Sequence, residues 1–420
     1  MSEPTHPRVL VIGAGVAGLG AAHALSGHAH VTLLERDDRL GGHAHTVVHY
    51  DPQLGPLDLD TGFLVYNPAT YPRLVALFDE LDVAWQHTEM SFSVSCERCG
   101  IEYSGRQLWR QPSLVLDRRV HALLMEIVRF LRRSPAHVDD PRHRDDTLDD
   151  YVRRHGHTDA FRDHFLVPLT AAIWSMSPGQ VRRFPIAYAL AFYRNHSLLG
   201  FRRNRWRNVV GGSARYVEAI ASRVTGEIAT ATPVERLERH DRGVTAVCHD
   251  GRRVHADAAV VATHPDAALA LIDGPTAAER DTLGALPYTR STAVLHTDAR
   301  LIPRRPACRA AWNYQLADCR DPHAAPTMTY YLNRLQRLDT TTHYMVTLNR
   351  GAHIDPARVI RTLAYDHPRY TFESLAAQAG LEEIQGTRRT WYAGAYHGYG
   401  FHEDGLRSGQ DAAARVRGAL

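Results

Sequence analysis

The pattern of hydrophobic and polar positions predicts a strand–helix–strand unit at the start of the chain. Residues 8–12 form a short β-branched apolar run, which is typical of a strand buried on both faces of a parallel sheet. Residues 19–25 have the composition of a short helix, and the turn residues Ser26 and Gly27 end it. A second apolar run at residues 30–34 predicts the neighbouring strand. We therefore expect an α/β fold.

The same kind of pattern returns in the middle of the chain. Residues 214–224 predict a helix, and residues 232–237 alternate as a strand does. The run at 244–248 and the Asp-Gly turn after it predict a hairpin. A buried strand expected at residues 256–263 then returns to the parallel sheet.

Two long segments between these pieces have different patterns. Residues 114–133 are apolar at helical spacing with arginines on the other face, and residues 146–174 and 186–199 also predict helices. Residues 291–348 are richer in alternating patterns, for example at 327–332. We expect a helical cap from the first segment and a sheet from the second.

Composition narrows the class of protein. The chain has 420 residues, 44% hydrophobic and 23% charged, which excludes a disordered or low-complexity protein. All 49 of its lysine-plus-arginine residues are arginine, so chemistry that needs a Schiff-base lysine or a P-loop lysine is excluded. The formal net charge of +3 gives no reason to expect nucleic-acid binding.

Cysteine usage and hydropathy indicate a compartment. Five cysteines in a chain of this length do not form a disulfide framework, and the odd number fits a reducing environment. The first seven residues are polar and do not resemble a signal peptide. No segment has the roughly 18 uninterrupted apolar residues of a membrane-spanning helix. We expect a cytoplasmic protein, with peripheral membrane contact left open.

A glycine-rich turn follows the first predicted strand. Gly13 permits the tight turn, and Gly15 lets the backbone approach a pyrophosphate. Gly18 allows close packing of helix on strand, and the first helical turn, which includes Ala17, offers N–H groups to phosphates. Glu35 ends the second strand, where its carboxylate can bind an adenosine ribose and would repel a 2′-phosphate. Together these residues predict a dinucleotide-binding site.

A second group of residues follows the acid. Arg36 comes directly after Glu35, and Gly41, Gly42 and the basic residue His43 come soon after. In this order they resemble the FAD-dependent superfamily of flavin amine oxidases and phytoene desaturases. The resemblance implies that the segment wraps the FAD pyrophosphate and ribityl chain, with His43 where many members have arginine.

The resemblance extends over nearly the whole chain and implies further FAD contacts. Gly62 and Phe63 resemble the second approach to the flavin, and Val234 corresponds to a residue whose backbone contacts the adenine. The C-terminal segment resembles the closing FAD motif, in which a helix N-terminus faces the N1/O2 edge of the flavin. It would contribute Gly394, Glu403, Asp404, Gly405 and Leu406. Ala395 stands where many relatives have an acid, so which later carboxylate meets the ribityl chain stays open.

Because the closing motif lies far from the glycine-rich turn, the FAD-binding domain must be discontinuous. We expect an α/β (α+β overall) protein with a Rossmann-like FAD-binding domain, made of a parallel sheet and a β-meander, and a β-sheet substrate domain with a helical cap. The FAD-binding domain would comprise residues 1–75, 205–270 and 385–420. The substrate domain would comprise residues 76–204 and 271–384, with sheet at 76–110 and 285–350 and the cap at 111–204.

The runs at 60–67 and 90–94 resemble most closely a bacterial subgroup of predicted NAD/FAD-binding oxidoreductases, often encoded near cyclopropane-fatty-acid synthase-like genes. Many amine oxidases of the superfamily place a lysine near flavin N5, and this chain has none. We therefore expect hydride removal from, or isomerisation of, a C–C bond in an apolar, long-chain fatty acyl or lipid substrate. Tyr66, Tyr396 and His402 are the candidate catalytic groups. Two alternatives stay open: an amine oxidase acting on a small amine or amino acid, and an FAD-fold lipid-binding protein without redox activity.

Other clusters have structural interpretations. Cys96 and Cys99 form a C-x-x-C pair, but a zinc site needs four ligands and no second pair exists, so we expect a tight turn between strands and no metal site. The histidines at 43–49 lack carboxylate support for a metal. A basic cluster is either a solvated face or, with the helix at 114–133, a surface for a lipid with an anionic end. It comprises Arg194, Arg202, Arg203, Arg205 and Arg207, interleaved with Phe201 and Trp206.

Overall fold

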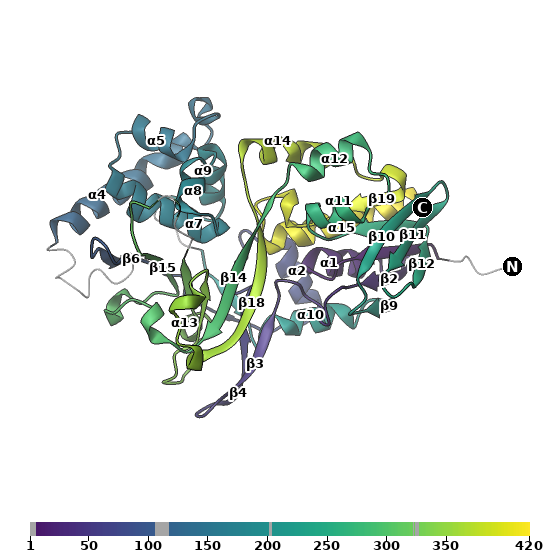
Figure 1. Ribbon diagram of the computed structural model, residues 1–420, viewed down its shortest axis with the longest axis horizontal. Helices are drawn as coiled ribbons and strands as arrows, with labels where there is room; N and C mark the ends of the chain where they lie inside the picture. Colours follow the sequence, from purple (N-terminus) through teal and green to yellow (C-terminus); the bar gives the residue numbers. More distant parts are fainter. Residues whose placement is uncertain (1–5, 106–116, 201–203, 322, 324–326) are drawn as a thin grey trace.

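The computed structural model describes residues 6–105, 117–200, 204–321, 323 and 327–420. The chain forms two halves joined by long strands (Figure 1). One half holds a parallel sheet between layers of helices and a small antiparallel sheet, and the other holds a larger sheet beside a group of helices. The expected α/β fold class is confirmed.

The parallel sheet has the strand order β19-β13-β1-β2-β9. Its strands are β1 (Arg8–Ile12), β2 (His30–Leu34), β9 (Gly226–Ala229), β13 (Ala258–Val261) and β19 (Thr390–Tyr392). Every neighbouring pair is parallel. The central strand β1 is buried after its first residue because both faces of the sheet are covered, which explains its continuous apolar run.

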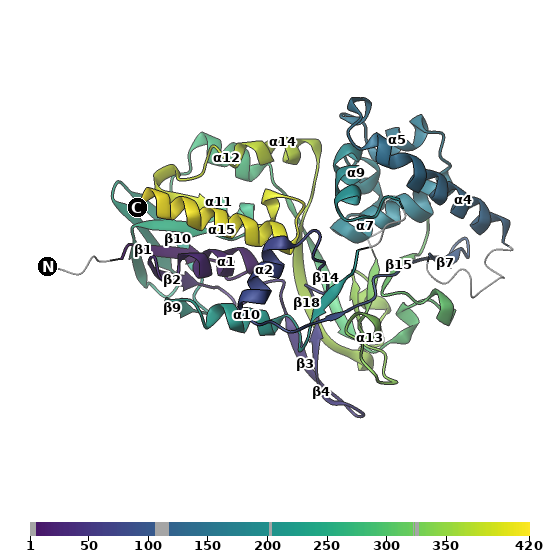
Figure 2. The same cartoon turned by 180° about the vertical axis from the view of Figure 1, so that it is seen from behind.

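Alternate residues of β1 point into two different layers. Val9 and Val11 pack against helices that include α1 (Val16–Leu25), α2 (Pro72–Glu80), α10 (Ala214–Ala221) and α15 (His402–Ala419). Leu10 and Ile12 pack against the expected meander and two helices. These are β10 (Val234–His240), β11 (Gly243–Cys248), β12 (Arg253–Ala256), α11 (Pro265–Leu271) and α12 (Ala277–Gly284). Helices α1 and α15 lie side by side in both views (Figure 2).

The single strand expected at residues 256–263 is divided in two. β12 ends at Ala256, β13 begins at Ala258, and the chain changes sheets at Asp257. The Asp257 N–H donates to the Arg8 oxygen at 2.8 Å, and the Asp257 carboxylate accepts from the Arg8 N–H at 2.7 Å. A polar crossing point fastened to β1 therefore replaces the expected continuous strand.

The larger sheet has the order β18-β14-β17-β16-β15-β6-β7. Its strands are β6 (Phe92–Cys96), β7 (Glu102–Ser104), β14 (Tyr288–His296), β15 (Trp312–Leu316), β16 (Met328–Tyr331), β17 (Met345–Leu348) and β18 (Val359–Pro368). Strand β18 lies outside the range 285–350 expected for this sheet, because its apolar residues do not alternate and the strand is mostly solvent-accessible. Two two-stranded antiparallel sheets pair β3 (Thr46–Asp51) with β4 (Gly55–Asp60), and β5 (Trp85–His87) with β8 (Arg207–Val209). Two further helices are α13 (Leu332–Leu335) and α14 (Phe372–Gly380).

The helical cap is more segmented than its apolar pattern predicts. Instead of one helix at 146–174, the chain forms several short ones, because Gly156 adopts a left-handed φ of +61° and Thr158 starts a new helix with its side chain. The cap helices are α4 (Arg118–Arg133), α5 (Leu148–Arg154), α6 (Asp159–Phe161), the π-turn η4 (Arg162–Leu166), α7 (Val167–Trp174), α8 (Pro178–Arg182) and α9 (Ile186–Asn195).

Helix α4 does not offer its apolar face to a membrane. Val120, Leu123, Ile127 and Phe130 are all buried in the core of the cap. The hypothesis that the apolar face of this helix contacts an approaching lipid is therefore wrong. Residues 114–116 of the expected helix lie outside the described residues. Among the described residues, no helix is long and apolar enough to cross a membrane.

Candidate functional site

The glycine-rich turn after β1 leaves open space at the N-terminus of α1. A Cβ at Gly13 would lie 2.8 Å from the Ala262 oxygen, and one at Gly18 would lie 1.8 Å from the Gly13 oxygen. At Gly15, by contrast, a Cβ would meet no atom within 4 Å. Ala17 is buried in the first helical turn. Packing thus fixes the turn, while Gly15 borders space in which a phosphate can meet helix N–H groups.

Glu35 lies beside this turn at the end of β2. One carboxylate oxygen accepts a hydrogen bond from the Ala14 N–H at 2.6 Å, and the other accepts from the Asp37 N–H at 2.9 Å. The acid is therefore held next to the open space. Arg36 is exposed. The Thr232 N–H donates to the backbone oxygen of Glu35 at 2.8 Å, which brings the start of β10 close to the carboxyl end of β2.

The nucleotide contacts of Arg36 and Val234 stay predictions. Val234 is half-buried and pairs with Cys248 in the meander, two residues after Thr232. Arg36 and Val234 lie near the carboxyl end of β2, where the adenosine end of a dinucleotide is expected.

The segment after Glu35 closes onto the glycine-rich turn. The Gly41 N–H donates to the Ala14 oxygen at 2.8 Å, and both Gly41 and Gly42 have positive φ, +103° and +57°. The Arg39 guanidinium donates to the Gly42 oxygen at 2.8 Å and to the Ala44 oxygen at 3.4 Å. Arg39 was not predicted as a site residue; its position just before the Gly-Gly pair is the signal that could have found it.

Gly62 and Phe63 continue this backbone contact. A Cβ at Gly62 would lie 2.2 Å from the His43 oxygen, and the Phe63 N–H donates to the same oxygen at 2.9 Å. Asp60 accepts hydrogen bonds at 2.8 Å from both the N–H and the hydroxyl of Ser213, at the start of α10. Burial raises the pKa of the Asp60 carboxyl to about 6.

Three rings gather around His43. Its ring centroid lies 4.9 Å from that of Tyr365, 5.6 Å from that of His367 and 6.3 Å from that of His264. Burial, and then the neighbouring histidines, lowers the pKa of His43 well below its ordinary value, and burial lowers that of His367 to about 4. Tyr365 and His367 belong to β18, so missing that strand hid them from sequence analysis.

Tyr66 and His402 lie in one aromatic cluster. The His402 ring stacks on Phe63 at 3.8 Å between centroids, and a hydrogen bond of 3.0 Å joins its Nε2 to the Tyr216 hydroxyl. Tyr66 stacks on the other side of the cluster, 6.3 Å from Phe63. Burial lowers the pKa of His402 to about 3 and raises that of Tyr66 to about 12, so both are neutral near pH 7.

Tyr396 is not part of this cluster. It is buried with Leu10 and Ile12 on the opposite side of the parallel sheet. Its hydroxyl has no hydrogen-bond partner among the described residues. Of the three predicted catalytic residues, the structure therefore brings together Tyr66 and His402 and places Tyr396 elsewhere.

The closing motif packs α15 directly on α1. A Cβ at Gly405 would lie 2.8 Å from the Val16 side chain, and one at Gly409 would lie 2.0 Å from the Ala17 oxygen. Leu406 is fully buried in the same contact, and the Gly394 N–H donates to the side chain of a serine in α15 at 2.9 Å. The first turns of the two helices therefore lie close together.

The two acids of the closing motif have partners in the protein. Glu403 accepts hydrogen bonds from the backbone N–H groups of Arg73 and Leu74, both at 3.0 Å, and so caps the start of α2. Asp404 accepts from the Phe401 N–H at 3.1 Å and from Arg407 at 3.0 Å. Their expected role as ribityl ligands is untested, and for Glu403 the hydrogen bonds to the start of α2 favour a structural role instead.

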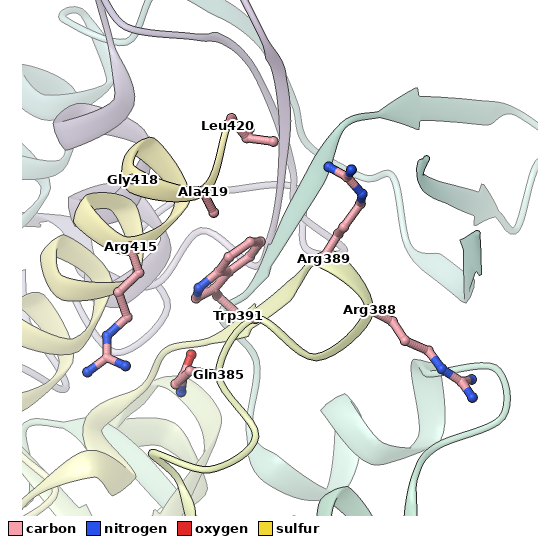
Figure 3. A pocket seen from close by; sticks show the side chains of 9 residues that line it. Gln385, Arg388, Arg389, Trp391, Arg415, Gly418, Ala419 and Leu420 are labelled. Atoms are coloured by element: carbon pink, nitrogen blue, oxygen red, sulfur yellow. The ribbon is translucent and has the colours of Figure 1, made fainter. Parts of the chain in front are cut away.

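A depression at the far end of α15 is separate from these segments. Figure 3 shows Trp391 at its centre, with Arg388, Arg389 and Arg415 pointing in different directions. Arg388 and Arg389 donate to backbone oxygens, and Arg415 pairs with Glu382 at 2.6 Å. These arginines are engaged with the protein, so the depression is not the candidate site.

Two observations show that the described residues suit a dinucleotide. Space is open at Gly15, where a pyrophosphate would meet the N-terminus of α1. In addition, the buried His367 Nδ1 has no hydrogen-bond partner among the described residues. A buried polar atom without a partner costs free energy, and a bound ligand that hydrogen-bonds to it removes this cost. The fold and the site together define a dinucleotide-binding protein; that its other half binds the substrate stays a prediction.

Comparison with known proteins gives the family. Residues 16–417 match the flavin containing amine oxidoreductase family, and the chain belongs to it. Membership of this flavin-containing family implies FAD as the cofactor. AofH of Mycobacterium tuberculosis (strain ATCC 25618 / H37Rv), assigned by name as a flavin-containing monoamine oxidase, is 26% identical over 265 residues, which are 61% of this chain and 57% of AofH. L-amino acid oxidase Cdc18 of Crotalus durissus cumanensis is 46% identical over 90 residues, 20% of this chain and 18% of that protein. The match thus spans little more than half of the longer-matching relative.

Solved structures share the fold over the full length. The CLA-producing fatty acid isomerase from P. acnes has a TM-score of 0.69 at 17% identity, with 99% of each chain covered. Cyclohexylamine oxidase from Brevibacterium oxydans IH-35A has a TM-score of 0.67 at 17% identity, again with 99% of each chain covered. At these identities the likeness shows the fold alone.

Proposed function

We propose that this protein removes hydride from, or isomerises, a C–C bond of an apolar, long-chain fatty acyl or lipid substrate. The observation that carries the proposal is the neutral wall formed by Phe63, Tyr66, Tyr216 and His402. Burial holds its histidine and tyrosines in their uncharged forms. Apolar methylene groups are stabilised against such a wall when they leave water.

In this proposal the wall orients the reacting carbon and excludes water. Bound FAD supplies the hydride acceptor. The His402 ring is held by stacking on Phe63 and by its hydrogen bond to Tyr216, so it cannot turn freely. Because the chain has no lysine, no ammonium side chain can stand beside the cofactor.

Arg207 is the group that would hold an anionic lipid end. It lies opposite Tyr66 in an isolated bridge, and its guanidinium carbon stands 3.5 Å from the centroid of the half-exposed Trp85 ring. The Arg207 Nε has no hydrogen-bond partner among the described residues. A planar guanidinium with an unpartnered, buried Nε suits a carboxylate. Arg202 and Arg203 of the basic cluster lie outside the described residues, and Arg194 pairs with Asp139.

An amine oxidase acting on a small amine or amino acid is the second candidate. The names of AofH and of the L-amino acid oxidase from Crotalus durissus cumanensis favour it, and an aromatic wall can also receive a cation. The third candidate is a lipid-binding protein that keeps the fold without redox activity. The fold is shared by a fatty acid isomerase and by cyclohexylamine oxidase alike, so the first proposal rests on the neutral aromatic residues and on the absence of lysine.

One experiment separates the three candidates. The FAD-loaded protein is mixed anaerobically with oleic acid, linoleic acid, putrescine or benzylamine, and the flavin spectrum and the lipid products are recorded. Flavin bleaching or a shifted double bond with the fatty acids, and no reaction with the amines, is the expected result. Bleaching by amines alone would favour the amine oxidase, and a protein that neither retains nor rebinds FAD would favour the lipid-binding candidate.

We also propose peripheral membrane contact through the β3–β4 hairpin. The hairpin extends beyond the body of the protein (Figure 1). Val48, Tyr50 and Leu54 on it are 69%, 71% and 43% exposed, whereas the apolar face of α4 is buried. Exposed apolar side chains with a tyrosine suit the interface of a bilayer.

A further inference from the structure

The fold brings three cysteines and a histidine together at the junction of the cap and the larger sheet. Cys96 ends β6, Cys99 follows it in the turn, and Cys319 lies just after β15. His164 comes from the π-turn η4 of the cap. One ligand atom from each residue lies within 4.8 Å of all the others. A tetrahedral zinc site with Zn–S bonds of about 2.3 Å needs sulfur atoms about 3.8 Å apart, which fits this spacing.

The backbone around the C-x-x-C pair is shaped to present two sulfur atoms on one side. The expected turn between β6 and β7 is confirmed, and Gly100 in that turn has a φ of +72°. The Cys96 sulfur accepts hydrogen bonds from the backbone of Cys99 and of Cys319, and the Cys99 sulfur accepts one from Ile101. Backbone N–H donors of this kind stabilise thiolates, the form that binds a metal.

His164 is oriented in the way that a metal-binding histidine requires. Its Nδ1 faces the Ala160 oxygen at 3.2 Å, so this nitrogen carries the proton, and Nε2 lies 3.2 Å from the Cys99 sulfur. The Tyr103 hydroxyl also donates to the His164 oxygen at 2.7 Å. The π-turn that carries His164 is a rare element, commonly found at functional positions.

We propose that Cys96, Cys99, Cys319 and His164 bind one structural zinc ion that fastens the cap to the larger sheet. Four protein ligands close the coordination sphere, which distinguishes a structural site from a catalytic one. Binding releases the thiol protons and leaves three thiolates and Zn²⁺ with a net charge of −1. The Arg119 guanidinium, which donates to the Cys99 oxygen at 2.9 Å, lies where it offsets that charge. The sequence showed only half of the site, because the other two ligands lie 65 and 220 positions from Cys99.

A second group of metal-type side chains provides the competing location. His137, His143 and His155 also lie within 4.8 Å of one another, and the His143 Nδ1 contacts the Asp146 carboxylate at 2.9 Å. This group has no thiolate and only three ligands, so we expect it to bind zinc more weakly.

Metal analysis of the full-length, FAD-loaded protein tests the proposal. After dialysis against a weak chelator, we expect about one zinc per chain, and almost none in Cys99→Ser or Cys319→Ser. Cys248→Ser and Cys308→Ser remove buried cysteines elsewhere and should retain the metal, as should His143→Gln. The proposal would be overturned if the protein contained no zinc, if both ligand variants retained zinc, or if only His143→Gln lost it.

A measurement on the unmodified protein covers the case in which the ligand variants do not fold. Exchange of zinc for Co²⁺ should give the visible absorption of a tetrahedral site with sulfur ligands. Removal of zinc should lower Tm and expose three additional thiols to titration, while the flavin spectrum stays unchanged. A mass lower by two hydrogen atoms, with a disulfide among these cysteines, contradicts the zinc site.

Discussion

Single residues decide whether the nucleotide turn can bind and whether it can fold. At Gly13 and Gly18 an added Cβ would collide with backbone, so these glycines serve the fold. At Gly15 the protein leaves space, so this glycine serves the ligand. The sequence motif predicts these different roles; the structure shows the close packing at Gly13 and Gly18, while the contact of Gly15 with a pyrophosphate stays a prediction.

We expect Gly15→Ala to impair FAD binding without unfolding the protein. Its φ of −69° suits alanine, so the free energy of unfolding should change by less than about 1 kcal/mol. FAD affinity should fall at least about tenfold, because the methyl group enters the space for the pyrophosphate. Fluorescence titration of apoprotein and urea unfolding measure the two quantities. Gly18→Ala is the control, and its 1.8 Å collision should lower stability first.

Asp60 should make stability depend on pH. Burial raises its pKa to about 6. The folded state therefore binds the proton more tightly than the unfolded chain, and the resulting stability is complete below about pH 4 and lost as pH rises through about 6. The loss amounts to roughly 3 kcal/mol.

Asp60→Asn should abolish this dependence, since an amide oxygen can still accept from Ser213. Urea unfolding at about pH 4 and pH 7 measures it. The control Asp58→Asn changes a carboxylate on the same strand whose side chain is 33% exposed, and it should retain the slope. An unchanged slope in Asp60→Asn would show that another group titrates.

Arg207 should affect the binding of a fatty acid but not of its ester. Arg207→Gln removes the charge near Tyr66 and should raise the KM for a free fatty acid about tenfold. The methyl ester of the same acid is the matched substrate, and its KM should change less than about twofold. Equal effects on both would assign Arg207 a packing role on Trp85.

At the scale of elements, apolar runs predicted the central strands well and polar edge elements poorly. β1, β2 and α10 are close to their expected bounds because burial on one or both faces gives a clear period. β18 was missed because an edge strand with polar residues has no such period. That omission concealed Tyr365 and His367, and the segmented cap likewise concealed the position of His164.

Glu403 should stabilise α2 rather than bind the cofactor. Glu403→Ala leaves the Arg73 and Leu74 N–H groups without an acceptor and should cost about 1–2 kcal/mol of unfolding free energy. FAD affinity should stay within about twofold of the unmodified protein. Glu403→Gln keeps one acceptor and should be intermediate in stability. A Gln variant with normal stability and weak FAD binding would instead make Glu403 a cofactor ligand.

At the scale of the whole molecule, the two-part architecture and the discontinuous nucleotide-binding sheet follow from motifs at both ends of the chain. The composition of the aromatic wall does not, because Phe63, Tyr216 and His402 meet only through tertiary packing. The same limit applied to Tyr396, whose place in the closing motif gave no sign that it packs on the other side of the sheet. The exact domain boundaries stay a prediction.

The β3–β4 hairpin should govern association with lipid vesicles. The double substitution Val48→Ser with Tyr50→Ser should reduce flotation with vesicles containing anionic lipid by more than about tenfold, since each side chain can bury apolar area in the interface. Met125→Ser on α4 removes a residue that is 58% exposed and should have no effect. Flotation that is equal in both variants would exclude the hairpin as the contact.

The contact of α15 with α1 has a consequence for how the protein is made. Strand β1 pairs with β2 early, but its other neighbour β13 and the glycine face of α15 on α1 come only after most of the chain has been synthesised. Until then, one edge of β1 and part of the apolar surface of α1 have no native cover, and contacts so distant in sequence form slowly. Nascent chains that stall before residue 402 should therefore depend on chaperones. In a reconstituted translation system, adding chaperones should raise the solubility of these stalled chains more than it raises that of the completed chain.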